Sequence, residues 1–187
     1  MFIRSERLFL RPGWPEDWEE LLGSIGDERI VRNLSRVPWP YSGEDARSFL
    51  EIPPTPLFPR FLMTVPGAGG ARIVGGIGLN NHGAGAELGY WVARDHWGRG
   101  YASEAARAVL DLSRTLGHTR ITARHLIDNP ASGRVLEKAG FRRTGRTVEV
   151  FSKARGGVFP GREYECILES ADDCGDDDAL MRCRRAA

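Results

Sequence analysis

The stretch HWGRGYASEAA, residues 96–106, contains two glycines two positions apart, followed by residues that favour helices. Backbone N–H groups at the start of a helix have no intrahelical partner and carry partial positive charge, so such a turn suits an anion. Gly98 and Gly100 allow close approach, and Arg99 adds a charge that can pair with a phosphate oxygen. The stretch therefore predicts either a phosphate-binding turn or a simple tight connection into a helix.

Three phosphate ligands are open at this point: a nucleoside triphosphate, a dinucleotide and coenzyme A. A nucleotide-binding P-loop requires the pattern GxxxxGK[ST], and the dipeptide GK does not occur in the chain. A dinucleotide fingerprint requires a third glycine and an acidic residue about 20 positions further on. Ser103 occupies the third glycine position, and residues 118–125, HTRITARH, contain no acid. A pyrophosphate loop of another kind remains.

The elements around this loop predict a mixed α/β (α+β) chain. Upstream, we expect strands at 6–12, 60–65, 72–79 and 86–92, helices at 15–24, at 27–33 and from Ser42 or Gly43, a loop at 52–59 and a hairpin turn at 80–86. Downstream, we expect a helix at 101–116, a strand at 120–126, a helix at 130–139, and strands at 142–153 and 162–169 that form a hairpin with a long turn. The helix at 101–116 is predicted to make a right-handed crossover.

The helix at 130–139 has unusually clear punctuation. Asn129 fits the N-cap position and Pro130 the first helical position. Gly140 lies where a left-handed glycine ends a helix, and Gly117 does the same after the preceding helix. These positions fix the two helices that follow the loop.

Composition and charge exclude several classes of protein. The 187 residues suit a single domain, and 41% hydrophobic with 27% charged residues indicates a soluble globular chain. A net charge of +1 gives no electrostatic footprint for nucleic acid. No apolar run approaches the roughly 18 residues that a membrane helix requires, and the N-terminus lacks an apolar signal core, so we expect no membrane contact and a cytoplasmic location.

The cysteines and histidines predict neither a disulfide framework nor a metal site. The three cysteines, Cys166, Cys174 and Cys183, are odd in number and form no CxxC pair, and the four histidines form no HExxH motif. Residues 171–187 are acidic, then basic, with little apolar content. We interpret 1–170 as one domain and 171–187 as a flexible surface tail.

Two motifs in order carry a resemblance to a known family. ELGYWVARDHWGRGYASEAARAVL, residues 87–110, followed by DNPASGRVLEKAGF, residues 128–141, closely resembles the GCN5-related N-acetyltransferases (GNAT), and within them the branch of ribosomal-protein alanine or serine N-acetyltransferases. The similarity spans roughly residues 4–168. Asp95 stands where the family's loop usually has Gln or Arg, so phosphate binding is expected to rest on backbone amides and Arg99.

The resemblance implies a mostly antiparallel central sheet flanked by helices and splayed where acetyl-CoA binds, with acetyl-CoA as donor and no metal. The cofactor-binding residues that it implies are Trp97, Gly98, Arg99, Gly100, Tyr101 and Ala102 around the pyrophosphate, Tyr90, Trp91 and Val92 beside the pantetheine, and Asn129 and Ser132. Gly89 is interpreted as a bulge that creates the splay or as a packing glycine, and Asn129 as a ligand, a helix cap or both.

Three residues are expected to carry the chemistry. Glu87 is the candidate base, acting through water, because alternation places it on one strand face with Gly89 and Trp91. Tyr90 is expected to offer its backbone N–H to the oxyanion, and Ser132 its hydroxyl to the departing thiolate. The simpler alternatives are a solvent-facing carboxylate for Glu87 and an ordinary first-turn serine for Ser132. The resemblance implies direct transfer without an acyl-enzyme.

The acceptor is expected to be a primary amine, either a peptide N-terminal α-amine or a small molecule. Trp39 and Tyr41, in a proline-rich loop, are candidates for the wall of the acceptor cleft together with Glu87, although both aromatic residues could instead cap the core. Edge strands of such a sheet leave a homodimer open. Two other functions compete with the transferase: a non-catalytic acyl-CoA-binding regulatory module on the same fold, and a dinucleotide-binding oxidoreductase.

Overall fold

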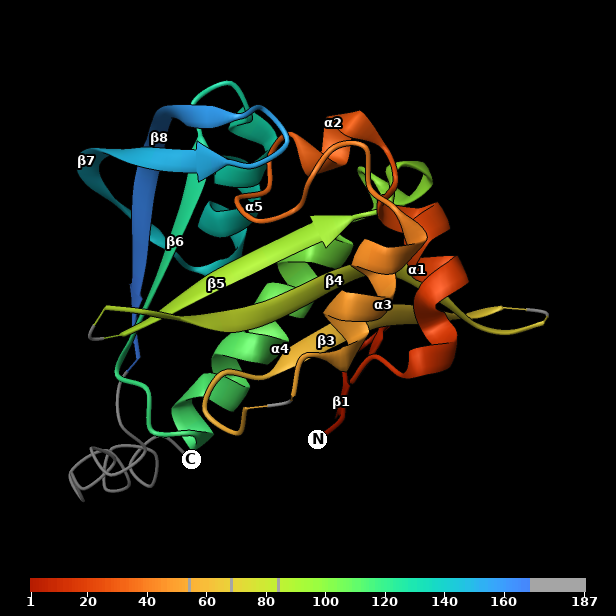
Figure 1. The fold of residues 1–187 in the computed structure, drawn as a ribbon. Helices are drawn as coiled ribbons and strands as arrows, with labels where there is room; N and C mark the ends of the chain where they lie inside the picture. The colour runs from red at the N-terminus through yellow and green to blue at the C-terminus, as the bar shows by residue number, and fades with distance from the viewer. Residues whose placement is uncertain (54, 68, 84, 169–187) are drawn as a thin grey trace, which may run out of the picture.

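A computed structural model describes residues 1–53, 55–67, 69–83 and 85–168, and in them the strands form one eight-stranded sheet (Figure 1). The strands are β1 (Ile3–Arg4), β2 (Phe9–Arg11), β3 (Arg60–Gly67), β4 (Gly70–His82), β5 (Gly85–Val92), β6 (Arg120–Leu126), β7 (Arg142–Ser152) and β8 (Gly157–Ile167). The helices are η1 (Pro15–Asp17), α1 (Trp18–Ile25), α2 (Glu28–Val31), α3 (Gly43–Glu51), η2 (Arg94–His96), α4 (Tyr101–Thr115) and α5 (Pro130–Ala139).

The order of strands across the sheet is β1-β2-β3-β4-β5-β6-β8-β7. Every neighbouring pair is antiparallel except β5 and β6, which are parallel and joined through α4. This parallel pair is very short, because only Ala86 with Ile121 and Glu87 with Thr122 are in register. The predicted mixed, mostly antiparallel sheet with flanking helices is therefore confirmed.

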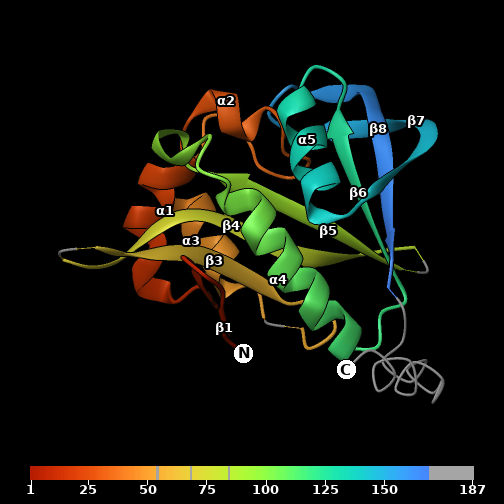
Figure 2. The ribbon, with the colours of Figure 1, turned by 180° about the vertical axis from the view of Figure 1, so that it is seen from behind.

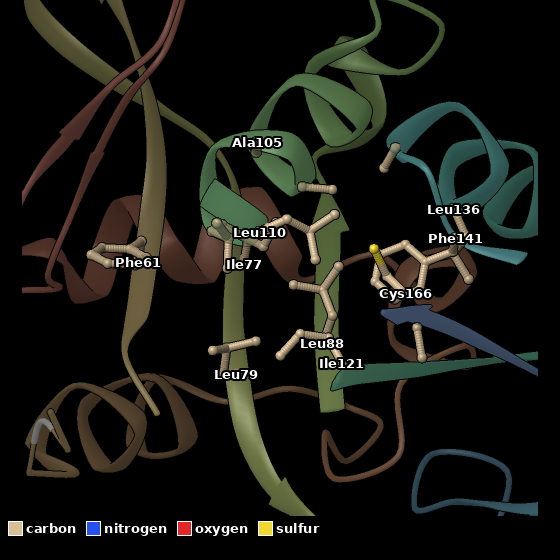
Figure 3. Close-up of a cluster of buried hydrophobic side chains, with 14 of the residues drawn as sticks. Phe61, Ile77, Leu79, Leu88, Ala105, Leu110, Ile121, Leu136, Phe141 and Cys166 are labelled. Atoms are coloured by element: carbon tan, nitrogen blue, oxygen red, sulfur yellow. The ribbon is translucent and has the colours of Figure 1, made fainter. Parts of the chain in front are cut away.

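Helices cover both faces of the sheet. On one face α4 crosses the central strands with α5 beside it (Figure 2), and on the other α1 and α3 lie over β3 and β4 (Figure 1). Helical spacing puts Ala105, Val109 and Leu110 of α4 toward the sheet, where they are buried against Leu88 and Ile121 (Figure 3). A second core under α1 contains Leu21, Ile25, Ile30, Val31, Ala46, Leu62 and Ile73.

The predicted helix punctuation is confirmed. Asn129 caps α5, its side-chain oxygen accepting the Ser132 N–H at 3.4 Å, and Pro130 is the first helical residue. Gly117 and Gly140 have φ values of 83° and 102°, a left-handed conformation that side chains other than glycine rarely adopt.

Several element boundaries differ from prediction. The N-terminal strand pairs only through Phe9–Arg11, and β4 and β5 continue into the predicted turn at 80–86. The C-terminal hairpin has a short turn, because β8 begins at Gly157 and pairs it with Ser152. Strand pairing overrides turn-forming residues here, since the neighbouring strand supplies the partners.

One prediction lies on residues that the structure does not describe. The predicted tail at 171–187, with Cys174 and Cys183, lies outside the described residues; Cys166 is a buried free thiol. Among the helices of residues 1–168 that the structure describes, none has the length and apolar character needed to cross a membrane.

Candidate active site

The site is organised by the opening between β5 and β6. The two strands lie side by side at their starts and then diverge (Figure 1), because their pairing ends at Glu87 and Thr122. β6 stays paired with β8 along its whole length, from Arg120 to Leu126, and so follows that strand away from β5. The edge of β5 beyond Glu87 therefore offers backbone groups to a ligand.

The opening does not depend on a bulge at Gly89, which was one of its predicted interpretations. The ladder between β4 and β5 runs without interruption from Gly75–Val92 to His82–Gly85, with Gly89 opposite Gly78. The irregularity lies one strand away, where the register between β3 and β4 shifts at Met63 and Thr64. The divergence of β6, rather than a distortion of β5, creates the splay.

One side-chain pair joins β5 and β6 at the point where their pairing ends, on the face of the sheet that α1 and α3 cover. The Arg124 guanidinium donates from Nε to Glu87 Oε1 at 2.7 Å and from Nη2 to Oε2 at 2.8 Å. Only 18% of the Glu87 side chain is exposed, so the pair is largely shielded from water. This bond raises the pKa of Arg124 above its usual value. The Glu87 carboxylate is thus fixed in place by an ion pair and is not an ordinary solvent-facing one.

A second side-chain pair lies on the opposite face of the sheet, the one that α4 and α5 cover. The Tyr90 hydroxyl lies 2.7 Å from the Ser132 hydroxyl and donates to the Ser132 carbonyl oxygen at 3.1 Å. Tyr90 packs against the core around α4, whereas the neighbouring Trp91 packs against the core under α1, as strand alternation requires. Two residues predicted from separate motifs, Tyr90 and Ser132, are therefore in contact.

The phosphate-type loop stands at the end of β5 and leads into α4. Gly98 and Gly100 have φ values of 75° and 81°, so both adopt the left-handed conformation. A Cβ added at Gly98 would meet nothing within 4 Å, so backbone conformation, not crowding, requires the glycine there. The side chains of Trp97 and Arg99 are exposed, and the first turn of α4, with Tyr101 and Ala102, points its free amides into this loop.

Trp97 modifies one predicted contact. Its indole Nε1 donates to the Val92 carbonyl oxygen at 2.7 Å. Because Trp97 already bonds this carbonyl and the backbone groups of Trp91 face β4, strand-like pairing of a ligand along residues 90–92 rests chiefly on Tyr90. The Trp97 bond also holds the start of the loop against the end of β5.

Sequence reasoning missed Arg7, which supports the loop from the far end of the chain. Its Nη1 donates to the Arg99 carbonyl at 2.9 Å, and its Nη2 lies 2.7 Å from Glu104 Oε2. Glu104 is only 6% exposed. Burial alone would raise its pKa, but hydrogen bonds from Ser5 and Arg7 outweigh burial and lower the pKa of this carboxyl. The one available signal was a glutamate on the buried face of a predicted helix.

Three segments that lie far apart in the sequence meet at a junction next to the start of α5. Arg155, in the turn between β7 and β8, donates to the Arg32 carbonyl at 2.8 Å and to Asn33 Oδ1 at 3.2 Å. Its guanidinium also pairs with Asp128 at 2.8 Å, and this bond lowers the pKa of Asp128. Arg155 is mostly buried, with 12% of its side chain exposed. No sequence pattern predicted this junction.

Trp39 and Tyr41 lie in the segment that follows this junction. Tyr41 is half-buried against the core under α1, where burial and the nearby Asp45 raise its pKa to about 12. Trp39 is 42% exposed. Tyr41 therefore has the core-capping position that was its alternative interpretation, and Trp39 remains free to contact a ligand. Within residues 1–168, apart from 54, 68 and 84, no three His, Cys, Asp or Glu side chains gather to hold a metal ion.

Comparison with known proteins assigns this chain to a family. Residues 7–142 match the model of the acetyltransferase (GNAT) domain, which is more than half of the chain. The chain belongs to the GNAT acetyltransferase family.

Individual relatives agree with this assignment. Over 72 residues, the chain is 38% identical to an uncharacterized N-acetyltransferase, p20, of Bacillus licheniformis; the match covers 38% of this chain and 40% of that protein. The chain spans less than half the length of the curated relatives that it matches. A GNAT-family acetyltransferase from Bacillus anthracis has a TM-score of 0.75 and 26% identity, covering 89% of this chain and 98% of its own.

Two further solved structures share the fold. A putative ribosomal-protein-serine acetyltransferase from Vibrio cholerae has a TM-score of 0.71 at 20% identity, covering 90% of this chain and 98% of its own. Spermidine N-acetyltransferase from the same organism, solved with CoA and spermine, has a TM-score of 0.68 at 21% identity, covering 86% and 95%.

Proposed function

We propose that this protein is an N-acetyltransferase that moves the acetyl group of acetyl-CoA directly to a primary amine. The observation that carries the proposal is the two-residue parallel pairing of β5 with β6, which leaves the β5 edge open directly below a glycine loop. An extended pantetheine arm fits such an edge, and a pyrophosphate fits the amides at the start of α4. Family membership supports the same donor.

The donor-binding residues are proposed as follows. The loop from Trp97 to Ala102 holds the pyrophosphate through backbone amides, with Arg99 adding charge and Arg7 fixing the loop from below. Tyr90 pairs with the pantetheine through its backbone, whereas the backbone groups of Trp91 belong to the ladder with β4. The Asn129 side chain caps α5 with its oxygen and keeps its two N–H donors for the pantetheine amide.

Glu87 is proposed as the base that removes a proton from the acceptor through water. Both of its oxygens accept from Arg124, so a water bound to Glu87 uses the remaining lone pairs of the carboxylate. A peptide α-amine has a pKa of about 7.7–8.0, against about 10.4 for a lysine side chain. An α-amine therefore loses its proton more easily and depends less on a base. Trp39, which is exposed, is proposed to border the acceptor.

The transfer itself needs no covalent enzyme intermediate. The neutral amine nitrogen forms a bond to the thioester carbon. The resulting oxyanion accepts a hydrogen bond from the Tyr90 backbone N–H. The carbon–sulfur bond then breaks with its electron pair on sulfur, where the Ser132 hydroxyl donates to the thiolate. The proton lost by nitrogen ends on sulfur through solvent, which gives an amide and free CoA.

The acceptor is proposed to be a peptide N-terminal amine or a small-molecule amine. The test incubates the full chain with acetyl-CoA and a panel of peptides and small amines, and follows thiol release and the mass of the products. Acetylated product from at least one class of amine supports the proposal. Acetyl-CoA binding without turnover on any acceptor would instead support a non-catalytic acyl-CoA-binding module.

A further inference from the structure

The contact between Tyr90 and Ser132 has more hydrogen-bond acceptors than donors. The Tyr90 hydroxyl is 3.1 Å from the Ser132 carbonyl oxygen and 2.7 Å from the Ser132 hydroxyl. Tyrosine and serine each bring a single O–H hydrogen. If Tyr90 donates to the carbonyl, the serine hydrogen points at the Tyr90 oxygen. If Tyr90 donates to the serine oxygen, the serine hydrogen is free to point elsewhere.

Burial keeps the phenol in its neutral, donating form. Tyr90 is half-buried against the core around α4, and this burial raises its pKa to about 12, with the Ser132 bond acting in the opposite direction. The phenol therefore keeps its hydrogen across the pH range in which an amine acetyltransferase works. It is a poor proton source and a constant hydrogen-bond donor.

The position of this pair matches the place where charge appears in the proposed reaction. Tyr90 comes from the open edge of β5 and Ser132 from the first turn of α5, so their contact lies across the splay. The same residue whose backbone N–H is proposed for the oxyanion thus carries the side chain that holds the serine. Both groups that stabilise negative charge are fixed by one residue.

We propose that the Tyr90 hydroxyl is a positioning residue that orients the Ser132 hydroxyl toward the sulfur of coenzyme A. This inference rests on the proposed function. Before transfer, the Tyr90 hydroxyl donates a hydrogen bond to the Ser132 carbonyl oxygen and accepts one from the Ser132 hydroxyl. As the carbon–sulfur bond breaks, Tyr90 turns its hydrogen to the serine oxygen, and the serine hydrogen turns to the thiolate. No proton leaves Tyr90.

The first experiment measures bound coenzyme A directly, without an acceptor. The thiolate fraction of CoA bound to the protein is followed by its ultraviolet absorbance as the pH is raised. Tyr90→Phe and Ser132→Ala should each lower this fraction about fivefold at a fixed pH below the thiol pKa, as expected for the loss of one hydrogen bond worth about 1 kcal/mol. The dissociation constant of CoA should change by less than about twofold, since binding rests on the loop.

The double variant separates positioning from simple support. If Tyr90 acts only through Ser132, Tyr90→Phe combined with Ser132→Ala should have the same thiolate fraction as Ser132→Ala alone. Full additivity of the two losses would overturn the inference, as would an unchanged fraction in Tyr90→Phe. With an accepted amine, kcat should follow the same pattern, while the KM for acetyl-CoA stays constant.

Tyr164→Phe is the matched control. It removes a phenol of the same core whose hydroxyl accepts from Arg143 Nε at 3.0 Å and donates to Glu137 Oε1 at 3.4 Å, with no hydrogen bond to Ser132. The thiolate fraction should equal that of the wild type; an equal loss in both tyrosine variants would attribute the effect to helix packing and overturn the inference. A wild type that binds CoA but acetylates no amine would contradict the proposed function alone, because the thiolate measurement still tests Tyr90.

Discussion

The two sides of the opening between β5 and β6 are built in different ways. The proposed donor side, residues 97–102 and 129–132, consists of two helix starts shaped mainly by residues next to them in sequence, with Arg7 as a long-range support of the loop. The proposed acceptor side, residues 32–41 and 152–155, is held by contacts between segments more than one hundred residues apart, such as Arg155 with Arg32. The first side thus depends mainly on local backbone conformation and the second on long-range side-chain bonds.

This difference predicts which properties can vary independently. A left-handed glycine or a helix cap acts within a few residues and keeps its geometry whatever the surrounding side chains are. A junction through one guanidinium changes when any of its partners changes. Cofactor binding should therefore be sensitive to few backbone positions, and acceptor choice to side chains at the Arg155 junction.

Gly100→Val should have the largest effect and tests the donor side. Valine strongly resists the φ of 81° found at Gly100, and a Cβ there would lie 3.4 Å from the Arg7 guanidinium. We expect acetyl-CoA affinity to fall about 100-fold, equivalent to about 2.7 kcal/mol. Isothermal titration calorimetry measures the change.

Gly117→Val is its control, because Gly117 ends the same helix with a φ of 83° and has nothing within 4 Å of an added Cβ. It introduces the same backbone strain far from the loop. Its acetyl-CoA affinity should match the wild type even if its melting temperature falls. Equal affinities in both variants would remove the loop from the donor site.

Glu87→Gln tests the chemistry between the two sides. If Glu87 is the base, its loss should lower kcat about 30-fold, slightly below the usual effect of roughly 10²–10⁴-fold for general acid–base catalysis. Arg124→Gln leaves the carboxylate in place and removes only its partner, so kcat should fall less than about fivefold. Steady-state kinetics with a peptide acceptor measure both. Equal losses would mean that the pair serves only to hold the strands.

The donor side was predictable because its signals are local. Asn129, Pro130 and Gly140 each act on the residues beside them, so their spacing defines α5 before any tertiary contact is known. Gly98 and Gly100 likewise predict a turn with a backbone conformation that only glycine adopts readily. The mixed α/β sheet followed from the succession of strands and helices, and the family resemblance supplied its mostly antiparallel pairing and the splay.

The rest was not predictable because it depends on which distant residues meet. Nothing near Arg155 indicates that its partners are Arg32, Asn33 and Asp128. Glu87 was predicted with the correct face, but its partner Arg124 comes from the next strand and depends on where the two strands part. Tyr90 is predicted for its backbone alone, because its side-chain bond to Ser132 depends on where the first turn of α5 meets β5.

Gly133→Ala tests whether α5 can shift without cost. An added Cβ would lie 2.8 Å from His125 Nε2 and 2.8 Å from the Tyr164 hydroxyl oxygen, so the helix must move away from the sheet. We expect a loss of about 1–2 kcal/mol in the free energy of unfolding, measured with urea. Gly23→Ala, in α1 with nothing within 4 Å of the added Cβ, should not be destabilised. A stable Gly133→Ala variant would show that α5 adapts easily.

Arg155→Met should have the smallest effect and tests the acceptor side. Methionine keeps much of the apolar stem but loses the bonds to Arg32, Asn33 and Asp128. We expect the KM for the acceptor to rise about fivefold, close to 1 kcal/mol, while acetyl-CoA affinity stays within about twofold.

Arg146→Met is the matched control for Arg155→Met. It lies on the same hairpin, but 62% of its side chain is exposed and its partner is Glu163, so the acceptor KM should not change. The competing outcome is physically specific, because Asp128 directly precedes the Asn129 cap of α5. If Arg155→Met lowers acetyl-CoA affinity as much as acceptor affinity, the junction also positions the cap. The donor and acceptor sides would then be one coupled unit, joined through residues 128 and 129.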